Sequence, residues 1–409
     1  MGLGERNTSR VREALLKPAP FGPDVDLDAY TAEPVSVGEV SGESGIPAEA
    51  RGAGERFGMN VEAASYIQLD ETALYRLMER VLGKYGVKIM PTRLALEKTD
   101  VGRSLAWRLV DPATDKYTAS TYLRGGELGY FIYVPRGVRV PVPIYTCLAI
   151  TGDRRIQYAH NIVFVDEGAE AHVVTGCAVP HGVREGVHIG VSEFYVSRNA
   201  RLTFTMMHAW ADGMHVRPRT AVRVEEGAEY VSYYIIYSPV ASLQTYPRTE
   251  LSAGGKAYLA SIVAGSGRGI YDQGSAAVLA GKGSSAEVVS RVVASDHAEV
   301  YARSSIDAYD AETRGHIECL GLLLSGKAMV SSIPVITSRK PGALLSHEAA
   351  IGMIAEKEIQ YLMSKGFTED EAKSVLVRGF MSIEVPGIPL AVKREVEKLL
   401  DRITRNAVG

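Results

Sequence analysis

The spacing of apolar residues changes along the chain and divides it into regions. Before the main β region, five apolar residues at intervals of three and four predict an amphipathic helix that Asp70 would cap and Gly83 or Gly86 would end. These residues are Leu74, Leu77, Met78, Val81 and Leu82. The later segments LAWRLVDP and KYTASTYLRGG predict short strands around an Asp-Pro turn. A small α/β region is therefore expected over residues 61–128.

Residues 1–60 show no sustained apolar period. They are rich in Gly, Glu, Pro and Ser, as in VGEVSGESGIPAEARGAGERFG. This composition is typical of an extended or partly mobile arm, so we expect no buried core there.

Helical patterns return after Ser338. The segment HEAAIGMIAEKEIQYLMS (347–364) has a helix-prone composition, and Thr368 with Glu371 has the spacing of a capping box ahead of AKSVLVRGFM. A third helix is expected over residues 390–405, with Val392, Val396, Leu399, Leu400 and Ile403 on one face. These helices predict a C-terminal helical domain over residues 341–409. It would cap the end of the preceding region, bind a partner, or do both.

Residues 129–340 contain short runs of Val, Ile, Tyr and Thr between Gly, Asn and Asp, with almost no helical period. A short motif recurs there: a turn residue, then Ala, then an apolar strand, as in EGAEAHV, RNARLTF and EGAEYVS. The alanines stand at positions 169, 200, 228, 257, 286, 298 and 328, so the gaps are 31, 28, 29, 29, 12 and 30. All gaps but one are nearly equal. Such a period favours a β-solenoid, in which an Ala fits where coils stack tightly, over a β-sandwich with similar turns.

Composition narrows the function classes. The 409 residues are 46% hydrophobic and 23% charged, which is typical of a folded globular protein. The formal charge of -3 and the lack of basic runs argue against nucleic acid as a partner. No apolar run approaches the ~20 residues of a membrane span, and the charged N-terminus does not resemble a secretory signal. We therefore expect a cytoplasmic protein.

The three cysteines, Cys147, Cys177 and Cys319, have no CxxC spacing, so a disulfide framework or a zinc knuckle is not expected. Cys319 lies in the probable strand HIECLGLLL, where alternation places it on the face opposite His316 and Glu318. It is either a small buried hydrophobic residue or a reactive thiol.

Ser346, His347 and Glu348 lie at the predicted junction between the β region and the first C-terminal helix. They would either cap that helix or supply ligands and a base beside a thiol. His347 comes 28 positions after Cys319, about one coil, so a solenoid would bring the two side chains together.

Cys177 lies in a turn-rich segment, and Cys147 is expected to be a packing residue of a strand. The sequence contains no GxxxxGK[ST] phosphate loop, GxSxG elbow or HExxH motif. Any nucleotide energy would therefore come from another chain.

Four segments in a fixed order resemble the SufB/SufD family of iron-sulfur cluster assembly proteins. They are GYFIYVPRGVRVPVPI (129–144), VFVDEGAEAHVVTGC (163–177), CLGLLLSGKAMVSSIP (319–334) and LSHEAAIGMIAEKEIQYLMSKGFTEDEAKSVLVRGF (345–380). The resemblance implies a mainly β protein: a right-handed parallel β-helix flanked by an N-terminal α/β region and a C-terminal helical domain. It also implies pairing as a homodimer or as a SufB–SufD heterodimer, and binding of the SufC ATPase through the C-terminal helical domain.

By this resemblance, Cys319 matches the SufB cysteine that receives sulfur and helps to build a nascent, transient iron-sulfur cluster. Glu348 matches an acidic residue beside that cysteine, and His347 matches a histidine on the SufD side of the dimer interface. Cys177 matches a cysteine on the route by which sulfur enters from a donor protein. The long cysteine-bearing N-terminal region of some SufB proteins has no counterpart in residues 1–60, so we expect no CxxC cluster ligands there.

The expected function is a SufB-like assembly scaffold, with ATP hydrolysed by SufC and without an enzyme activity of its own. One alternative is a SufD-like structural subunit without a cluster. A distant one is a β-helix enzyme acting on polysaccharides, which would need clustered carboxylates or Arg in a groove. Whether the dimer is homo or hetero, the cluster type, the sulfur and iron donors and flavin binding are not readable from the sequence.

Overall fold

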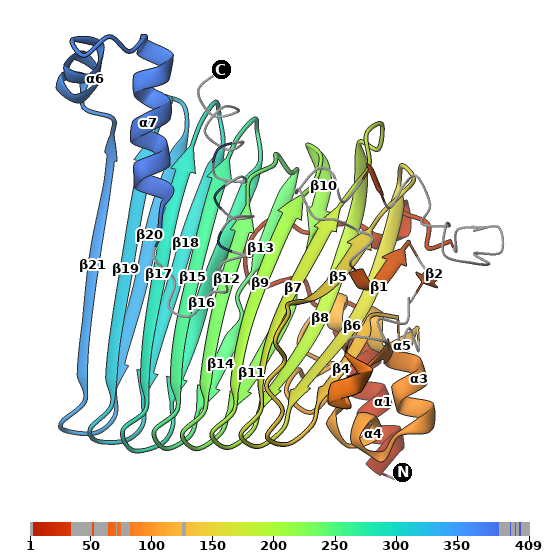
Figure 1. The fold of residues 1–409 in the computed structure, drawn as a ribbon. Helices are drawn as coiled ribbons and strands as arrows, with labels where there is room; N and C mark the ends of the chain where they lie inside the picture. The colour runs from red at the N-terminus through yellow and green to blue at the C-terminus, as the bar shows by residue number, and fades with distance from the viewer. Residues whose placement is uncertain are drawn as a thin grey trace.

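The computed structural model describes residues 3–33, 51–52, 64–70, 72–74, 82–124 and 128–383, together with residues 393, 397 and 401. It is a parallel β-solenoid of about eight turns with helices at both ends (Figure 1). Each full coil contributes strands to two facing sheets. The predicted fold class is therefore confirmed, and the β-sandwich alternative is wrong.

Sheet I forms one wall. In spatial order its strands are β2 (Thr72–Leu74), β1 (Ala64–Leu69), β5 (Ile144–Ala149), β7 (Glu170–Ala178), β9 (Arg201–Ala209), β12 (Glu229–Ile236), β15 (Lys256–Gly265), β17 (Ser285–Ala294), β19 (Arg314–Leu323) and β21 (Leu344–Met353). All neighbours in this sheet except β1 and β2 are parallel, as a solenoid requires.

Sheet II forms the opposite wall. Its strands are β10 (Gly213–Val216), β13 (Ser242–Thr245), β16 (Ile270–Leu279), β14 (Arg248–Leu251), β11 (Arg219–Val224), β8 (Glu185–Val196), β6 (Arg155–Val165), β4 (Tyr130–Val134) and β3 (Lys88–Pro91), with β18 (Glu299–Ala308) and β20 (Met329–Ser338) continuing from β16.

The register between strands explains the alanine repeat. The alanines at 169, 200, 228, 257 and 286 lie at the starts of neighbouring sheet I strands, whereas those at 298 and 328 lie at the starts of sheet II strands. The one short gap, from position 286 to position 298, is therefore the step from one wall to the other within a single coil. Most of these alanines are buried beside the turns, where a larger side chain would separate the stacked coils.

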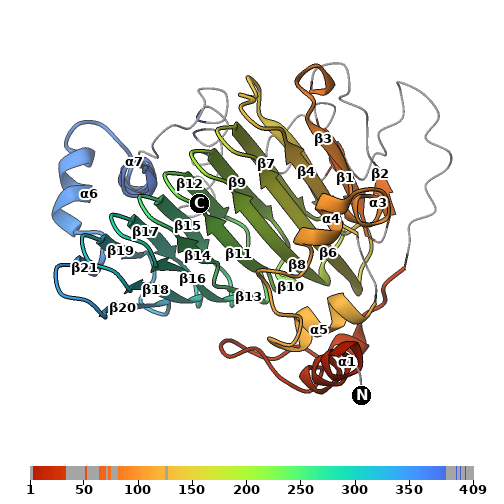
Figure 2. The same ribbon diagram turned by 90° about the horizontal axis from the view of Figure 1, so that it is seen from below.

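Alternation along each strand produces the core. In β18, for example, Val300, Ala302, Ser304 and Ile306 are buried, while the residues between them face out. The inward side chains of both sheets form one continuous hydrophobic core that runs through the lumen of the solenoid. Figure 2, seen from below, shows the two walls as separate layers.

Backbone hydrogen bonds join the turns of successive coils along one edge of the solenoid. Gly168 and Asn199 occupy corresponding turn positions with φ of 67° and 55°, a region that favours Gly and tolerates Asn. The N–H of Gly168 donates to the carbonyl of Arg198 at 2.9 Å, and the N–H of Asn199 donates to the carbonyl of Glu226 at 3.0 Å. The backbone ladder thus continues from the strands into the turns.

The N-terminal helices are α1 (Leu3–Ala14), α3 (Thr92–Lys98), α4 (Asp100–Leu105) and α5 (Lys116–Leu123), with short 3₁₀ turns at Leu27–Ala29 and Gly83–Tyr85. The expectation of no core in the arm is wrong for α1, because Val11 and Ala14 are buried against α5. The strand predicted in LAWRLVDP does not form, and the one predicted in KYTASTYLRGG is wrong too. Asp115 accepts from the N–H groups of Tyr117 and Thr118 and forms a capping box that starts helix α5 instead.

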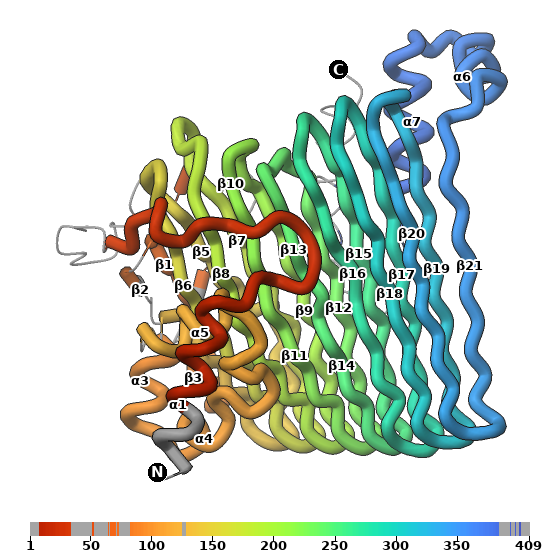
Figure 3. Tube along the Cα trace, turned by 180° about the vertical axis from the view of Figure 1, so that it is seen from behind, coloured from red at the N-terminus to blue at the C-terminus, as the bar shows by residue number. Residues whose placement is uncertain are grey.

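A strap formed by residues 15–33 crosses the outer face of sheet II (Figure 3). The buried guanidinium of Arg217 donates to the carbonyl of Pro23 at 2.9 Å. Farther along, the Arg303 guanidinium lies 3.9 Å from the centre of the Phe21 ring and also binds Asp272 through two of its nitrogens. The strap therefore connects the N-terminal end to strands several coils away.

The helix predicted after Asp70 does not begin there. Residues 72–74 form strand β2, and most of the remaining positions of that prediction lie outside the described residues. Asp70 has a φ of 47° and is buried, and its carboxylate accepts from the N–H of Thr151 and pairs with Arg155 at 2.6 Å. Its side chain thus fixes the end of a strand and does not cap a helix.

The C-terminal part begins with a strand. Residues 344–353 form β21, so the helix predicted from His347 is wrong over its first half; helix α6 covers Glu356–Met363. Pairing with β19 overrides the helix-prone composition. Helix α7 (Glu369–Met381) has the predicted capping box of Thr368 and Glu371, and Val377 and Met381 pack onto sheet I. Most of the third predicted helix lies outside the described residues; of its positions, Lys393, Glu397 and Asp401 are described, and these three are helical.

In the described part of the chain, we find no helix with the length and hydrophobicity needed to cross a membrane.

Candidate functional site

Cys319 lies in β19 and points into the lumen near the C-terminal end of the solenoid. It is 2% exposed, and its neighbours Ile317 and Gly321 face the same way. The predicted alternation, with His316 and Glu318 on the outer face, is confirmed. The Sγ atom lies 3.6 Å from the Oγ atom of Ser304, which reaches across from sheet II. The thiol therefore has a hydroxyl group as its neighbour inside the lumen.

His347 and Glu348 lie on β21, the strand next to Cys319, but their side chains leave opposite faces. The ladder between β19 and β21 pairs His347 with Ile317, Glu348 with Glu318 and Ala349 with Cys319. His347 therefore shares the face of Cys319 but lies two positions away along the strand. The prediction that an offset of 28 places His347 directly beside Cys319 is wrong by these two positions.

Glu348 belongs to the outer face of sheet I. Its register partner Glu318 forms an ion pair with Arg291 of β17. On the same face, Nδ1 of His316 lies 2.9 Å from Oγ of Ser346. Glu348 and Cys319 are thus separated by the sheet itself. Within the described residues, no three side chains of His, Cys, Asp or Glu are grouped closely enough to hold a metal ion.

The last coil ends in two open edges. In the described structure β21 pairs with β19 and β20 pairs with β18, while the other side of each strand has no neighbour in its sheet. Large apolar side chains are exposed there: Val335, Ile336, Leu344, Ile351 and Met353. Open edges with exposed apolar residues are typical of a surface to which another strand is added.

Cys177 lies in the lumen several coils from Cys319. It is fully buried, pairs with Leu148 and His208 in the sheet, and has its Sγ atom 3.7 Å from Sδ of Met206. Burial raises the pKa of the Cys177 thiol well above its ordinary value. Cys147 faces the other side of sheet I and packs there as predicted, and burial raises the pKa of its thiol to about 12.

A row of polar side chains occupies one register position between the two cysteines. Tyr234, Ser261, Ser290 and Cys319 are successive partners across β12, β15, β17 and β19. The hydroxyls of Ser261 and Ser290 lie 2.9 Å apart. The motifs of the sequence did not point to these residues, although counting back from Cys319 in steps of about one coil would have found them.

Comparison with protein-family models finds a match over more than half of the chain. Residues 148–380 match the family model described as "SUF system FeS cluster assembly, SufBD core domain". This range contains Cys177, Cys319, His347 and Glu348, and it ends within α7. The match therefore covers the lumen, the open edges and the first C-terminal helices.

Curated relatives align over almost the whole chain. A protein of Methanothermobacter thermautotrophicus named "Iron-sulfur cluster assembly SufBD family protein" is 38% identical over 96% of this chain and 97% of its own length. A protein of the same name from Archaeoglobus fulgidus is 37% identical over 90% of this chain and 99% of its own. The "Iron-sulfur cluster assembly protein SufB" of Bacillus subtilis is 26% identical over 94% and 84%. The chain therefore belongs to the SufBD family of iron-sulfur cluster assembly proteins.

Proposed function

We propose that this protein is a SufB-like scaffold that receives sulfur and iron and builds a nascent cluster at a dimer interface. The observation that carries the proposal is the position of Cys319, a lumen-facing thiol on the strand next to the open edge formed by β21. A second SufB/SufD-type chain added at this edge would bring its own histidine and carboxylate to the thiol. The cluster is the cargo of such a site, and it leaves with a client protein.

The residues divide the proposed chemistry. Cys319 accepts the outer sulfur of a donor persulfide: a sulfur–sulfur bond forms at Cys319, and the donor leaves as a thiol. The resulting persulfide and the side chains of His347 and Glu348 offer one soft and two harder ligands to iron. Because the two harder ligands lie on opposite faces of one strand, they serve the thiol together only if a partner chain supplies one of them.

Cys177 and the polar row extend the proposal toward the donor. The row from Tyr234 through Ser261 and Ser290 leads along the lumen to Cys319, and its hydroxyls offer hydrogen bonds to a polar sulfur species. We assign Cys177 to the beginning of this route. Its high pKa in the closed lumen calls for an opening step before it reacts.

A partner ATPase of the SufC type supplies that step in this proposal. The region of α6 and α7 exposes large apolar side chains, namely Tyr361, Met363, Phe367 and Val375, as a docking surface for it. ATP-driven movement of two ATPase subunits would then pull on the helices that pack against sheet I.

Spectroscopy of the reconstituted protein tests the assignment. The full-length chain is incubated anaerobically with iron and sulfide, as wild type, Cys319→Ser and Cys147→Ser. We expect an absorption band near roughly 400 nm from thiolate-ligated iron in the wild type and in Cys147→Ser, and its loss in Cys319→Ser. Cys147→Ser is the matched control because it removes a buried thiol from the other face of the same sheet.

An equal band in Cys319→Ser would contradict the scaffold role and favour the SufD-like structural alternative. That role is tested directly by adding a SufB-type partner chain: a structural subunit would show the band only in the presence of the partner.

A further inference from the structure

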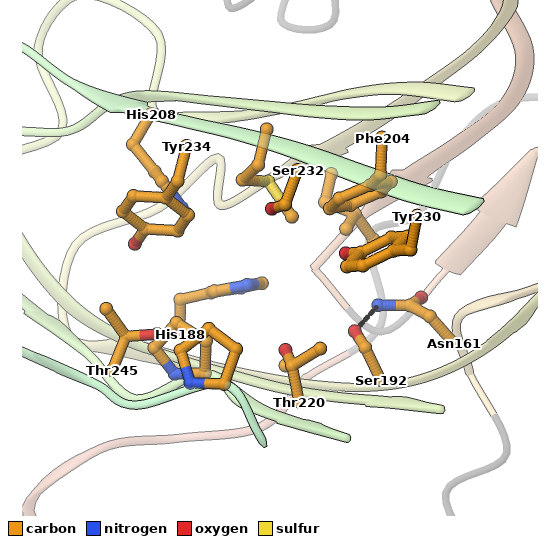
Figure 4. Close-up of a pocket in the computed structure, with 15 residues that line it drawn as sticks. Asn161, His188, Ser192, Phe204, His208, Thr220, Tyr230, Ser232, Tyr234 and Thr245 are labelled. Atoms are coloured by element: carbon orange, nitrogen blue, oxygen red, sulfur yellow. Dashed lines mark hydrogen bonds between the residues drawn. The ribbon is translucent and has the colours of Figure 1, made fainter. Parts of the chain in front are cut away.

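A small cavity lies inside the lumen between β9 and β12 of sheet I and β8 and β11 of sheet II. The volume of the cavity is about 30 Å³. Figure 4 shows that polar side chains surround it from both walls. They include His188, Ser192, His208, Thr220, Ser232, Tyr234 and Thr245.

Two polar atoms at this cavity have no hydrogen-bond partner among the described residues. They are Nε2 of His208 and the hydroxyl oxygen of Tyr234, both fully shielded from solvent. The two rings are neighbours, with centroids 4.9 Å apart. A buried polar group without a partner loses its hydrogen bonds to water and gains none in return, so native proteins almost always satisfy it.

The hydrogen bonds around the cavity fix which nitrogens carry protons. The indole N–H of Trp210 donates to Nδ1 of His208 at 2.9 Å. Nδ1 therefore accepts through its lone pair, and the neutral ring carries its proton on Nε2. The unpartnered Nε2 of His208 is therefore a donor.

His188 has the opposite tautomer. The amide nitrogen of Gln157 donates to the carbonyls of Asp70 and Ala149, which leaves its Oε1 atom as the partner of His188 Nδ1 at 2.9 Å. Nδ1 therefore carries the proton, and Nε2 is an acceptor. Burial lowers the pKa of His188 to about 4, so the ring is neutral at pH 7.

We propose that this cavity is a built binding site for one or two water molecules, held by the His208 Nε2–H donor and the Tyr234 hydroxyl. A water molecule needs roughly 10–15 Å³ of cavity volume, so the cavity has room for two. The walls then offer the water molecules a hydrogen-bond donor, His208 Nε2–H, and an acceptor, His188 Nε2. The lumen is accordingly hydrated at this point, although the core around it is apolar.

The same tautomers argue against a metal ion. A cation on His208 Nε2 would require that nitrogen to lose its proton while Nδ1 keeps accepting from Trp210, which gives an anionic ring. The orphaned donor also argues against an apolar occupant, because only a hydrogen-bonding molecule satisfies it.

The site lies one side chain away from Cys177. Met206 lines the cavity, and its Sδ atom is 3.7 Å from the Cys177 thiol. Resting on the proposed function, this water gives the sulfur route a polar, proton-exchanging point inside the lumen. The presence of the water is measured independently of any cluster, so the two ideas stay separable.

A crystal structure of the full chain at a resolution that shows ordered water tests the site. We expect one or two water peaks within about 3.2 Å of His208 Nε2 and Tyr234 Oη. Tyr234→Phe should remove or shift the peak at Oη. Tyr233→Phe is the matched control, because Tyr233 lies on the same strand and is buried on the opposite face; it should leave the peaks in place.

Xenon provides a second measurement on the same crystals. A dry cavity of this kind takes up xenon under pressure, and a hydrated polar one does not. An empty cavity, xenon in the wild-type protein, or identical peaks in Tyr234→Phe would each overturn the proposal. Water peaks in a protein whose Cys319 proves dispensable would leave the site intact and refute the proposed function alone.

Discussion

Cys319 lies beside Ala349, its register partner on the last strand of sheet I. His347 is two positions away on the same face, and Glu348 faces outward on the other side. A single chain thus presents the thiol and the histidine toward the lumen and the carboxylate toward the outside. Within a dimer, the proposed site must take at least one of these residues from the second chain.

Mixed dimers test this division. We expect neither Cys319→Ser nor Glu348→Ala alone to form a cluster, because each homodimer lacks one ligand at both sites. Co-expression of the two variants should restore about half of the wild-type cluster per mixed dimer, since one site then combines Cys319 of one chain with Glu348 of the other. Iron and sulfide content of the purified mixed dimer measures the result.

The histidine supplies the comparison for this experiment. Because His347 shares the lumen face of Cys319 in its own chain, co-expression of Cys319→Ser with His347→Ala should restore nothing. Recovery in that pair and none in the carboxylate pair would reverse the assignment, with Glu348 acting within the chain and His347 across the interface.

The open edge should mediate dimerisation. Ile351 is 43% exposed on β21, and Ile351→Glu places a charge in the apolar patch that the partner strand would cover. We expect sedimentation equilibrium to give half the wild-type mass for this variant. Leu16→Glu, at an exposed apolar residue near the N-terminus, should keep the wild-type mass, and a dimeric Ile351→Glu protein would rule out this edge as the interface.

Gly274 should tolerate no side chain. A Cβ atom there would lie 1.5 Å from the carbonyl oxygen of Arg303, a backbone atom of the neighbouring strand. We expect Gly274→Ala to cost at least about 3 kcal/mol and to lower the yield of soluble protein. Gly326→Ala, where nothing lies within 4 Å, is the control for the thermal unfolding midpoint. Equal midpoints would mean that the strands can separate at this point.

His188 should make the protein sensitive to mild acid. Its pKa is about 4 in the folded state because of burial, against about 6.5 when exposed. Between these values the unfolded chain binds a proton that the folded chain does not, so stability falls as pH falls, by up to about 1.4 kcal/mol per pH unit. Urea unfolding at pH 7.5 and pH 5 should show a smaller loss for His188→Gln. The exposed His181→Gln should match the wild type.

Asp115 should matter both as a cap and as a charge. It is fully buried, caps α5 and pairs with Arg219 at 2.7 Å. We expect Asp115→Ala to cost about 3–5 kcal/mol, because it removes the cap and leaves the largely buried Arg219 without its carboxylate. Asp115→Asn keeps an acceptor oxygen and should be the milder variant by about 1 kcal/mol in thermal unfolding. An equal loss would assign the effect to the charge alone.

Several elements followed directly from local patterns. The alanine period predicted the solenoid because every coil must turn at equivalent places, and alternation around Cys319 gave its face because side chains of a strand point alternately to two sides. The capping box at Thr368 marked the start of α7 because its two hydrogen bonds join residues three apart. These features can be read along the sequence without knowing which strands pair.

Contacts between distant segments settled the rest. Residues 344–353 have a helix-prone composition but form β21, because β19 offers a complete ladder of hydrogen bonds. The same ladder places Cys319 beside Ala349, 30 positions later. The spacing of the repeat varies from 28 to 31 residues, so it does not distinguish a partner 28 positions away from one 30 positions away. The order of residues was enough to predict the kind of fold and the candidate residues. Which of these residues meet depends on strand register, a long-range property set by the packing of whole coils.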